Sequence, residues 1–367
     1  MDSNGARWNN SGLVENSEPL LPGVPRTGRL VLWSFFSNKQ GMPTVTSVTI
    51  HPSQFPDSVR RDLLESLRTR RVNHKFHYDS VKQTRKWLAL HETYSPSRYD
   101  SDCVATYNRA FAEAAADISS KSVHLIGLGC GGGQKDTQLL RRLKTSGQKL
   151  FYTPSDVSVA MTLVARKAAL KVVSPENCFP FVCDLATATD LDESLFDSRA
   201  GGAKRVITFF GMIPNFEPNE ILPRLANLVR RNDTLLFSAN LAPGNDYAAG
   251  LRKILPQYDN PLTRDWLVTF LLDLGIERHD GKMEFRIASG AFGLKRVIGQ
   301  FDLTRARSVT VDSREFHFRR SQSIRLFFSY RYTPDRVRNT LSRYGLEVTK
   351  QWITASEEEG VFLCRRK

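Results

Sequence analysis

The sequence predicts an α/β protein in which a doubly wound, Rossmann-like sheet closes with an antiparallel hairpin and is accompanied by a second, α+β lobe. The first observation is an apolar run, residues 123–128, that ends in a cluster of glycines and precedes a helical pattern. The second is the alternation of strand-like and helical segments that continues to residue 239. The third is a pair of strand-like runs, 346–352 and 360–364, near the end of the chain.

The remaining elements follow from apolar periodicity. Before the glycines, a short strand is expected over residues 45–50 and helices over 57–70, 81–90 and 105–118. After them come strand-like runs at 149–152, 179–183, 205–210 and 234–239, with a helix over 217–230. The alternation then breaks: a helical, aromatic stretch at 258–274 precedes strand-like runs around Phe285, Phe301 and Phe316. A helix over 333–344 leads back to the terminal hairpin.

These segments divide the chain into five expected parts: a flexible tail (1–30), the first part of the second lobe (31–104), a cofactor-binding core (105–245), an inserted lobe (246–332) and a C-terminal return to the core sheet (333–367). The tail is rich in Asn, Ser, Gly and Pro and has few periodic apolar positions, so it is expected to be mobile or loosely docked. With 367 residues, 41% of them hydrophobic, the chain can bury a full core.

Composition also limits the partners and the compartment. The sequence has no apolar run of about 18 residues and no N-terminal signal pattern, so we expect no membrane span and take the cytoplasm as the default location. The net charge of +14 makes a nucleic-acid partner worth weighing. Because the basic clusters are scattered and no nucleic-acid-binding module accompanies them, solvated faces or attraction for small anions are preferred.

Neither a disulfide framework nor a metal centre is expected. The five cysteines are odd in number and lack CxxC spacing, which is typical of small buried side chains. No HExxH is present, and the seven histidines show no metal-ligand spacing.

The glycine cluster leaves two cofactor classes open. Glycines permit a turn with positive φ and let a ligand approach the backbone closely. Gly127, Gly129 and Gly132 satisfy GxGxxG, so a nicotinamide dinucleotide and an oxidoreductase remain an alternative. Against that alternative, a terminal antiparallel hairpin is less common in dehydrogenases than another parallel strand.

Two acidic residues at strand ends favour S-adenosylmethionine (SAM). Asp156 follows Gly129 by 27 residues, beyond the roughly 20 of the dinucleotide pattern, and could accept both ribose hydroxyls. Asp184 ends the next strand and could accept the adenine amino group. A glycine loop with two such acids suits SAM, which has no pyrophosphate to bind. The alternative is that both acids are only helix caps and turn residues.

With these segments in place, the chain resembles the histidine-specific methyltransferase family, whose members include ergothioneine-biosynthesis enzymes and fungal relatives acting on tryptophan and prenylated tryptophan. The likeness covers about residues 45–366. It rests on short motifs in a fixed order: Lys75-Phe76-His77-Tyr78-Asp79, Glu92-Thr93-Tyr94 with Arg98, Leu128-Gly129-Cys130-Gly131 with Lys135, Pro154-Ser155-Asp156-Val157-Ser158, Phe210-Gly211 with Ile213-Pro214-Asn215-Phe216, Tyr258-Asp259, and Ile324-Arg325 with Ser329-Tyr330-Arg331-Tyr332.

The resemblance implies a class I SAM-dependent methyltransferase sheet, a substrate-binding second lobe and a specific set of site residues. It places the cofactor against Tyr78, Gly129, Gly131, Lys135, Asp156, Asp184 and Leu185. It places Tyr94, Gly211, Asn215 and Tyr258 around the α-amino and carboxylate groups of an amino acid, with Phe327 and Ser329 at its side chain. Tyr94 and Asn215 are the candidate catalytic residues, which would position the amine.

Two departures from the family pattern bear on the substrate. The family's Ile-Gly-Asn is Ile213-Pro214-Asn215 here, and its approach is one residue shorter. The glutamate that binds imidazole in the family is replaced by Phe327. Losing a buried partner for an imidazole N–H costs about 1–3 kcal/mol. We therefore expect N-methylation of an amino acid or related amine other than histidine. A SAM-fold protein without catalysis, or one that methylates RNA through its basic surface, stays as a further alternative.

Overall fold

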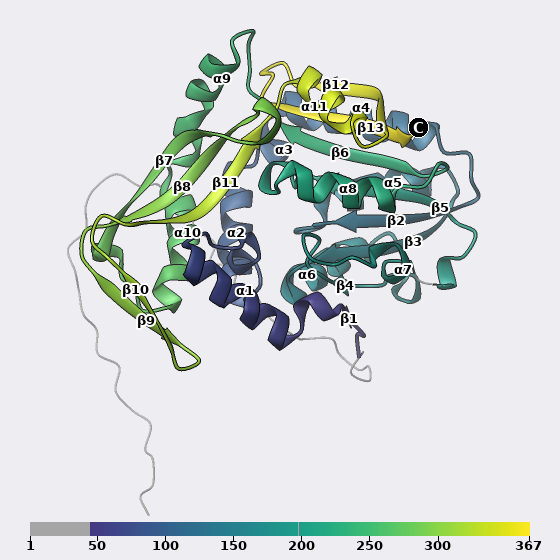
Figure 1. Cartoon of the computed structure of the whole chain (residues 1–367). Helices are drawn as coiled ribbons and strands as arrows, with labels where there is room; N and C mark the ends of the chain where they lie inside the picture. Colours follow the sequence, from purple (N-terminus) through teal and green to yellow (C-terminus); the bar gives the residue numbers. More distant parts are fainter. Residues whose placement is uncertain (1–44, 197) are drawn as a thin grey trace, which may run out of the picture. The chain divides into compact units, whose positions relative to one another are not determined.

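The computed structural model describes residues 45–196 and 198–367 and centres on a mainly parallel sheet (Figure 1). Within these residues the sheet has eight strands, in the spatial order β1 (Thr49–Ile50), β4 (Phe181–Val182), β3 (Lys149–Asp156), β2 (Ser122–Leu128), β5 (Lys204–Phe210), β6 (Thr234–Asn240), β13 (Glu359–Arg366) and β12 (Leu346–Ile353). Strand β13 is antiparallel to both β6 and β12. The predicted Rossmann-like sheet with its terminal antiparallel hairpin is thus confirmed.

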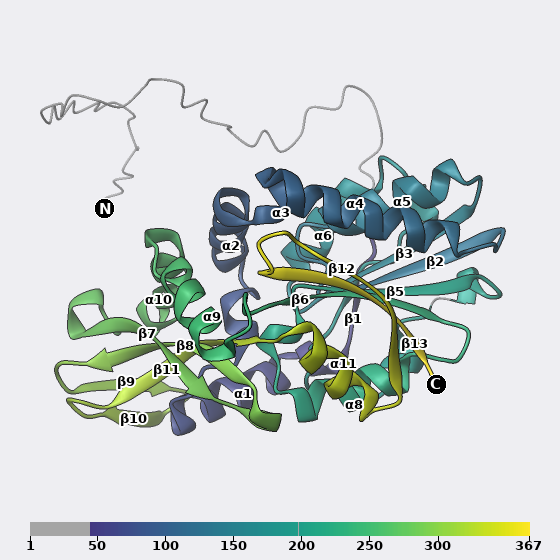
Figure 2. The same cartoon turned by 90° about the horizontal axis from the view of Figure 1, so that it is seen from above.

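Two layers of helices cover the sheet, as Figure 2 shows. One layer contains α4 (Ser101–Ala116), α5 (Gln134–Thr145) and α6 (Val159–Ala169). The other contains α7 (Leu191–Ser194), α8 (Pro218–Leu228) and α11 (Pro334–Ser342). Each layer buries its own apolar cluster against the sheet, which is why β2 is a nearly continuous apolar run rather than an alternating one.

A second lobe lies beside the core and has its own apolar cluster. Its three-stranded antiparallel sheet has the order β11 (Ser323–Arg331), β8 (Lys295–Leu303), β7 (Gly281–Ser289), and a hairpin of β9 (Arg307–Val311) and β10 (Arg314–Phe318) adjoins it. The helices of the lobe are α1 (Pro56–Thr69), α2 (Val81–Tyr94), α9 (Tyr247–Ile254) and α10 (Pro261–Asp273). Short helix α3 (Pro96–Tyr99) leads from α2 into α4.

Short 3-10 turns connect these elements, and several border the site described below. They are η1 (Pro52–Gln54), η2 (His74–His77), η3 (Pro175–Asn177), η4 (Ser198–Ala200), η5 (Ile213–Asn215), η6 (Leu255–Tyr258), η7 (Arg278–Asp280) and η8 (Ala291–Gly293). Strand β11 returns to the core through a bridge between Tyr332 and Leu241, just after β6.

The contacts divide the chain into Met1–Thr46 and Ser47–Lys367, and all elements above belong to the second unit. The predicted tail, residues 1–30, and the first part of the predicted 31–104 segment lie outside the described residues. The strand expected over 45–50 is shorter than predicted, because only its last two residues pair, with β4. None of the helices in the described part is long and apolar enough to cross a membrane.

Candidate active site

A cavity of about 570 Å³ opens at the carboxyl ends of β2, β3 and β5. Its walls come from the glycine loop after β2, the end of β3, the residues after β4, turn η5, and α1, η2, α2 and β11 of the lobe. Ligand sites in doubly wound sheets lie at this edge, and cavities of 300–1,000 Å³ are typical for small molecules. The cavity is therefore the candidate active site.

The glycine loop and Asp156 form one wall of the cavity. Gly129 and Gly131 have φ of +61° and +51°, the left-handed region that glycine adopts without strain. The backbone N–H groups of Gly131 and Ser158 donate to the two Asp156 carboxylate oxygens at 3.2 and 3.1 Å. Burial raises the pKa of Asp156 to about 6, although these N–H groups oppose the shift. The carboxylate keeps lone pairs that can accept two hydroxyl groups.

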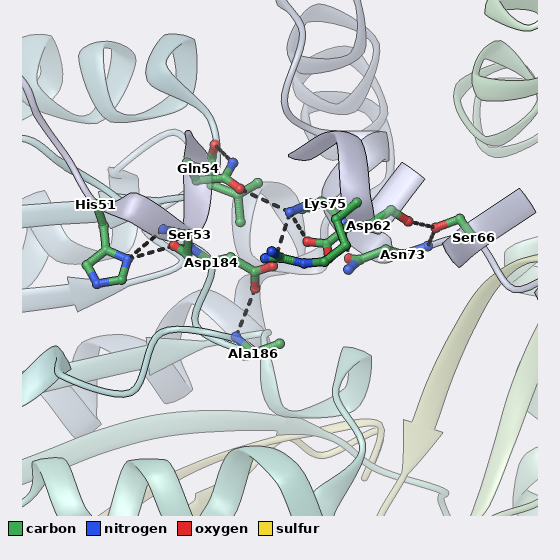
Figure 3. A network of polar contacts seen from close by, with 11 residues as sticks. His51, Ser53, Gln54, Asp62, Ser66, Asn73, Lys75, Asp184 and Ala186 are labelled. Atoms are coloured by element: carbon green, nitrogen blue, oxygen red, sulfur yellow. Dashed lines mark hydrogen bonds and ion pairs between the residues drawn. The ribbon is translucent and has the colours of Figure 1, made fainter. Parts of the chain in front are cut away.

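Asp184 lies at the next strand end, within a buried ion-pair network that Figure 3 shows. Its Oδ1 accepts from the Ala186 N–H at 2.9 Å, and its Oδ2 lies 3.6 Å from Lys75 Nζ. Lys75 also pairs with Asp62 of α1 and donates to Gln54 at 3.3 Å. No hydrogen bond in the described chain reaches Asp184 Oδ2, although this atom is buried. A buried acceptor without a donor at the cavity wall fits an adenine amino group.

A third polar cluster joins α5, α4 and the terminal hairpin. Lys135 Nζ donates to the Tyr107 hydroxyl at 2.6 Å and lies 3.4 Å from Glu359 Oε1. Tyr107 in turn donates to Glu359. Burial raises the pKa of Glu359, but the Lys135 charge and the hydrogen bonds outweigh it and hold this pKa below its ordinary value. A charged Lys135–Glu359 pair thus borders the cavity beside the glycine loop.

Between the cofactor end and the lobe, turn η5 borders the cavity. Gly211 and Asn215 both line it. Gly211 has a φ of +69°, and its N–H donates to the Ser238 hydroxyl at 2.9 Å. The Asn215 N–H donates to the Met212 carbonyl at 2.9 Å, which fixes the turn.

The lobe end of the cavity is aromatic and charged. His74, Arg325 and Phe328 line it, and the His74 ring meets the Phe328 ring edge-on at 4.5 Å. Burial lowers the pKa of His74 well below its ordinary value, so this imidazole is neutral. Glu217 also lines this end, and its carboxylate is shared between Arg296 and the Tyr330 hydroxyl.

The cavity brings together most of the residues that the sequence pointed to. Nine of them line it: Tyr78, Gly129, Gly131, Lys135, Asp156, Asp184, Leu185, Gly211 and Asn215. Tyr94 does not; it is the last residue of α2, is 46% exposed, and is followed by the cavity-lining Ser95 and Pro96. Tyr258, Phe327 and Ser329 also lie outside the lining, with a 2.9 Å hydrogen bond between Tyr258 and Ser329.

A β-bulge explains the position of Phe327. The pairing of β11 with β8 shifts register between Arg325 and Phe327, so one extra residue interrupts the alternation of side chains. Leu326 and Phe327 consequently both join the apolar cluster of the lobe, whereas Arg325 and Phe328 line the cavity. Phe327 stacks on His74 at a ring distance of 5.5 Å.

Sequence reasoning assigned no role to several residues at the cavity, among them Lys75, Trp87, Arg325 and Glu359, whereas Phe328 could be weighed either as strand core or as part of the pocket. Lys75 and Arg325 occur in two of the motifs that support the family resemblance, and this was the available signal. No sequence motif pointed to Trp87 or Glu359, because only the tertiary fold brings them to the cavity, from α2 and β13.

The residues present fit SAM. The strand-end acids offer acceptors for ribose and adenine, and the glycine loop leaves backbone next to the ligand. In the described ranges no group of three or more His, Cys, Asp or Glu side chains could hold a metal ion. The site therefore offers binding and positioning for an adenosine cofactor.

Comparison with known proteins decides between the cofactor classes. The profile of the family described as histidine-specific, SAM-dependent methyltransferases matches residues 59–259 and 293–366. The chain is 25% identical over 278 residues to the N-methyltransferase imqF of Aspergillus flavus, covering 74% of this chain and 73% of imqF.

Similar solved structures include two other methyltransferases. The magnesium protoporphyrin IX methyltransferase of Synechocystis, with bound S-adenosylhomocysteine (SAH), is 14% identical with a TM-score of 0.41, covering 79% of this chain and 97% of that one. The 1,6-didemethyltoxoflavin-N1-methyltransferase of Burkholderia thailandensis is 10% identical with a TM-score of 0.36, covering 77% and 90%. The family match spans most of the chain, and the chain thus belongs to the histidine-specific, SAM-dependent methyltransferase family.

Proposed function

We propose that this methyltransferase N-methylates an amino acid or an amino-acid-derived small molecule other than histidine. The observation behind the proposal is that one cavity is lined both by the cofactor residues Asp156 and Asp184 and by Asn215 at the border of the lobe. An acceptor held at Asn215 would share that cavity with the cofactor. The relative imqF bears the name of an N-methyltransferase, which agrees with nitrogen as the acceptor.

The protein's main task in this reaction is to position the acceptor nitrogen relative to the methyl group. When bound, SAM would supply a methyl group on its sulfonium sulfur; a neutral acceptor nitrogen in line with the S–C bond would form a bond to the methyl carbon as that S–C bond breaks, giving SAH and an N-methylated ammonium. Correct orientation of two reactants can supply roughly 7–11 kcal/mol of the barrier. An alkyl amine of pKa near 10 is about one part in a thousand neutral at pH 7, a cost of roughly 4 kcal/mol. The Asn215 side-chain oxygen can accept from the amine N–H and so orient the lone pair, while water takes the released proton.

Tyr94 is proposed as a second positioning group. Its side chain is partly exposed at the end of α2, one residue before the cavity-lining Ser95. Rotation of this side chain toward the cavity would bring its hydroxyl to the acceptor, so the proposal requires a movement when the acceptor binds. Tyr258 and Ser329, which bond to one another, are proposed to support the lobe wall behind the acceptor.

The surroundings of Phe327 argue against histidine as the acceptor. The ring that stacks on Phe327 is the imidazole of His74, a residue of the chain itself, and Tyr258 and Trp266 pack on other sides at 5.9 and 6.1 Å. No carboxylate takes the place of the family's glutamate at this position. A substrate imidazole would therefore find neither a charged partner nor free space there.

The test is a screen of amino acids and their amines with purified protein and SAM, in which fragmentation mass spectrometry locates the added methyl group. The proposal expects the methyl on nitrogen, histidine among the poor acceptors, and a loss of kcat of at least tenfold in Asn215→Leu with the SAH Kd unchanged. Methylation on oxygen or carbon alone, or histidine as the preferred acceptor, would contradict it.

A further inference from the structure

We propose that Arg325, assisted by Arg71, binds a carboxylate of the methyl acceptor at the lobe end of the cavity, an inference that rests on the proposed acceptor class. Both arginines line the cavity. A bridge between their backbones places them side by side where α1 ends and β11 passes. The Arg325 N–H donates to the Arg70 carbonyl and the Val72 N–H to the Arg325 carbonyl, both at 2.9 Å, so this junction is firmly held.

Within the described chain the Arg325 guanidinium forms no ion pair, although the Glu217 carboxylate is near enough to act on it electrostatically. Within residues 45–196 and 198–367, no carboxylate lies within 4.0 Å of the side-chain nitrogens of Arg325 or Arg71. The Arg325 guanidinium lies over the Phe328 ring, with its Cζ 5.1 Å from the ring centroid. Arg325 is partly buried, and a charged group in that position is costly unless it is paired.

The acidic groups nearby are engaged elsewhere. Glu217 gives one carboxylate oxygen to Arg296 and the other to Tyr330. Glu65, which also lines the cavity, is exposed to solvent and accepts two hydrogen bonds from Arg68. Asp62 pairs with the buried Lys75. Glu220 of α8 also lines the cavity, but it is exposed to solvent, so its charge is screened.

Local charge also favours an anion. Burial, and to a lesser extent the neighbouring charges of Arg296 and Arg71, lowers the pKa of Arg325 to about 10, and the opposing charge of Glu217 does not cancel this shift. A carboxylate would relieve that repulsion, and the planar guanidinium can hold both of its oxygens at once. Phe328 offers an apolar surface beside the charge, so an acceptor that joins an apolar body to a carboxylate fits this end.

The test measures binding rather than turnover, so that it does not depend on the proposed methylation. Protein saturated with SAH is titrated by calorimetry with indole-3-acetate, with its neutral isostere indole-3-acetamide, and with inorganic phosphate. We expect the acid to bind at least tenfold more tightly than the amide. Tighter binding of phosphate than of the acid would identify a phosphate site and overturn the carboxylate assignment, as would equal affinity for acid and amide.

Variants locate the effect. Arg325→Gln is expected to remove the preference for the acid over the amide, Arg325→Lys to retain part of it, and Arg71→Gln to weaken it less, because Arg71 is exposed. The matched control is Arg314→Gln in β10, an exposed arginine outside the cavity lining. A preference that survives unchanged in a folded Arg325→Gln protein overturns the proposal, and if that variant does not fold, the comparison in the wild type and in Arg325→Lys still decides.

The two proposals fail separately. If indole-3-acetate binds in an Arg325-dependent manner but no amino acid is methylated in the screen, the carboxylate site stands and the proposed acceptor class falls. If amino acids are methylated but the acid and the amide bind equally, the proposed acceptor class stands and the carboxylate site at Arg325 falls.

Discussion

The backbone N–H of Gly131 donates to the Asp156 carboxylate at 3.2 Å and thereby joins the glycine loop to the end of β3. The same carboxylate accepts from the Ser158 N–H at the start of α6. One side chain therefore holds the loop, the strand end and the next helix in place. Asp156 is consequently both a proposed ligand for ribose and a structural support of the cofactor site.

Replacing Asp156 should weaken cofactor binding. We expect Asp156→Ala to raise the Kd for SAH at least tenfold, about 1.4 kcal/mol, because the ribose hydroxyls lose their acceptor and the loop loses its anchor. Calorimetry with SAH measures the effect, and Asp57→Ala on the exposed first turn of α1 is the control. An unaltered Kd in Asp156→Ala would remove this residue from the site.

The affinity for SAH should fall in mild acid. Because burial raises the pKa of Asp156 to about 6, the carboxylate is mostly ionised at pH 7 and mostly protonated at pH 5. Protonation removes acceptor capacity, so the Kd should rise about tenfold between pH 7 and pH 5. Asp136 titrates in the same range, but it is bonded to Thr208 and Tyr152. Asp156→Asn should therefore flatten the pH profile, and a profile that persists in this variant would point to another group.

The buried Lys75 should contribute to the free energy of unfolding and, through its contact with Asp184, to the cofactor site. Its side chain is 1% exposed and lies between Asp62 and Asp184, so Lys75→Met would leave the half-buried Asp62 and the buried Asp184 without their cation. Breaking such a buried pair costs about 3–5 kcal/mol. Lys82→Met, which breaks the exposed pair with Asp273, should cost less than about 1 kcal/mol in the same urea unfolding experiment. Equal effects of the two substitutions would show that the Lys75 network contributes little.

Phe327→Glu should not create a histidine methyltransferase. The new carboxylate would lie behind the half-buried imidazole of His74, because Phe327 stacks on that ring and does not itself line the cavity. We expect a lower melting temperature and unchanged relative rates across a panel of amino acids. A gain of activity toward histidine would show that position 327 does reach the acceptor.

Much of the core could be predicted because its signals are local. The apolar run of β2, the glycines after it and the acids at the next strand ends are contiguous in sequence, and each of these elements lies where it was expected. The order of the strands could not be read from any single segment. The terminal hairpin could be read from one segment, and it distinguished this sheet from that of a dehydrogenase.

The lobe wall of the site was less predictable for physical reasons. The β-bulge near Leu326 depends on how β11 pairs with β8, and without it Phe327 and Phe328 cannot be assigned to their faces. The roles of Lys75 and Arg325 depend on which charges the tertiary fold brings near them or keeps away. The side-chain direction of Tyr94 depends on the end of α2, which periodicity does not define.

The central claim is that one cavity presents an acceptor nitrogen to SAM. The most direct measurement is a single-turnover reaction of the purified protein with SAM carrying a labelled methyl group and a mixture of amino acids and their amines, analysed by mass spectrometry. The account predicts label on the nitrogen of at least one amino acid or derived amine, with an equal amount of SAH formed. Tight binding of SAH without any transfer of label to the mixture would contradict it.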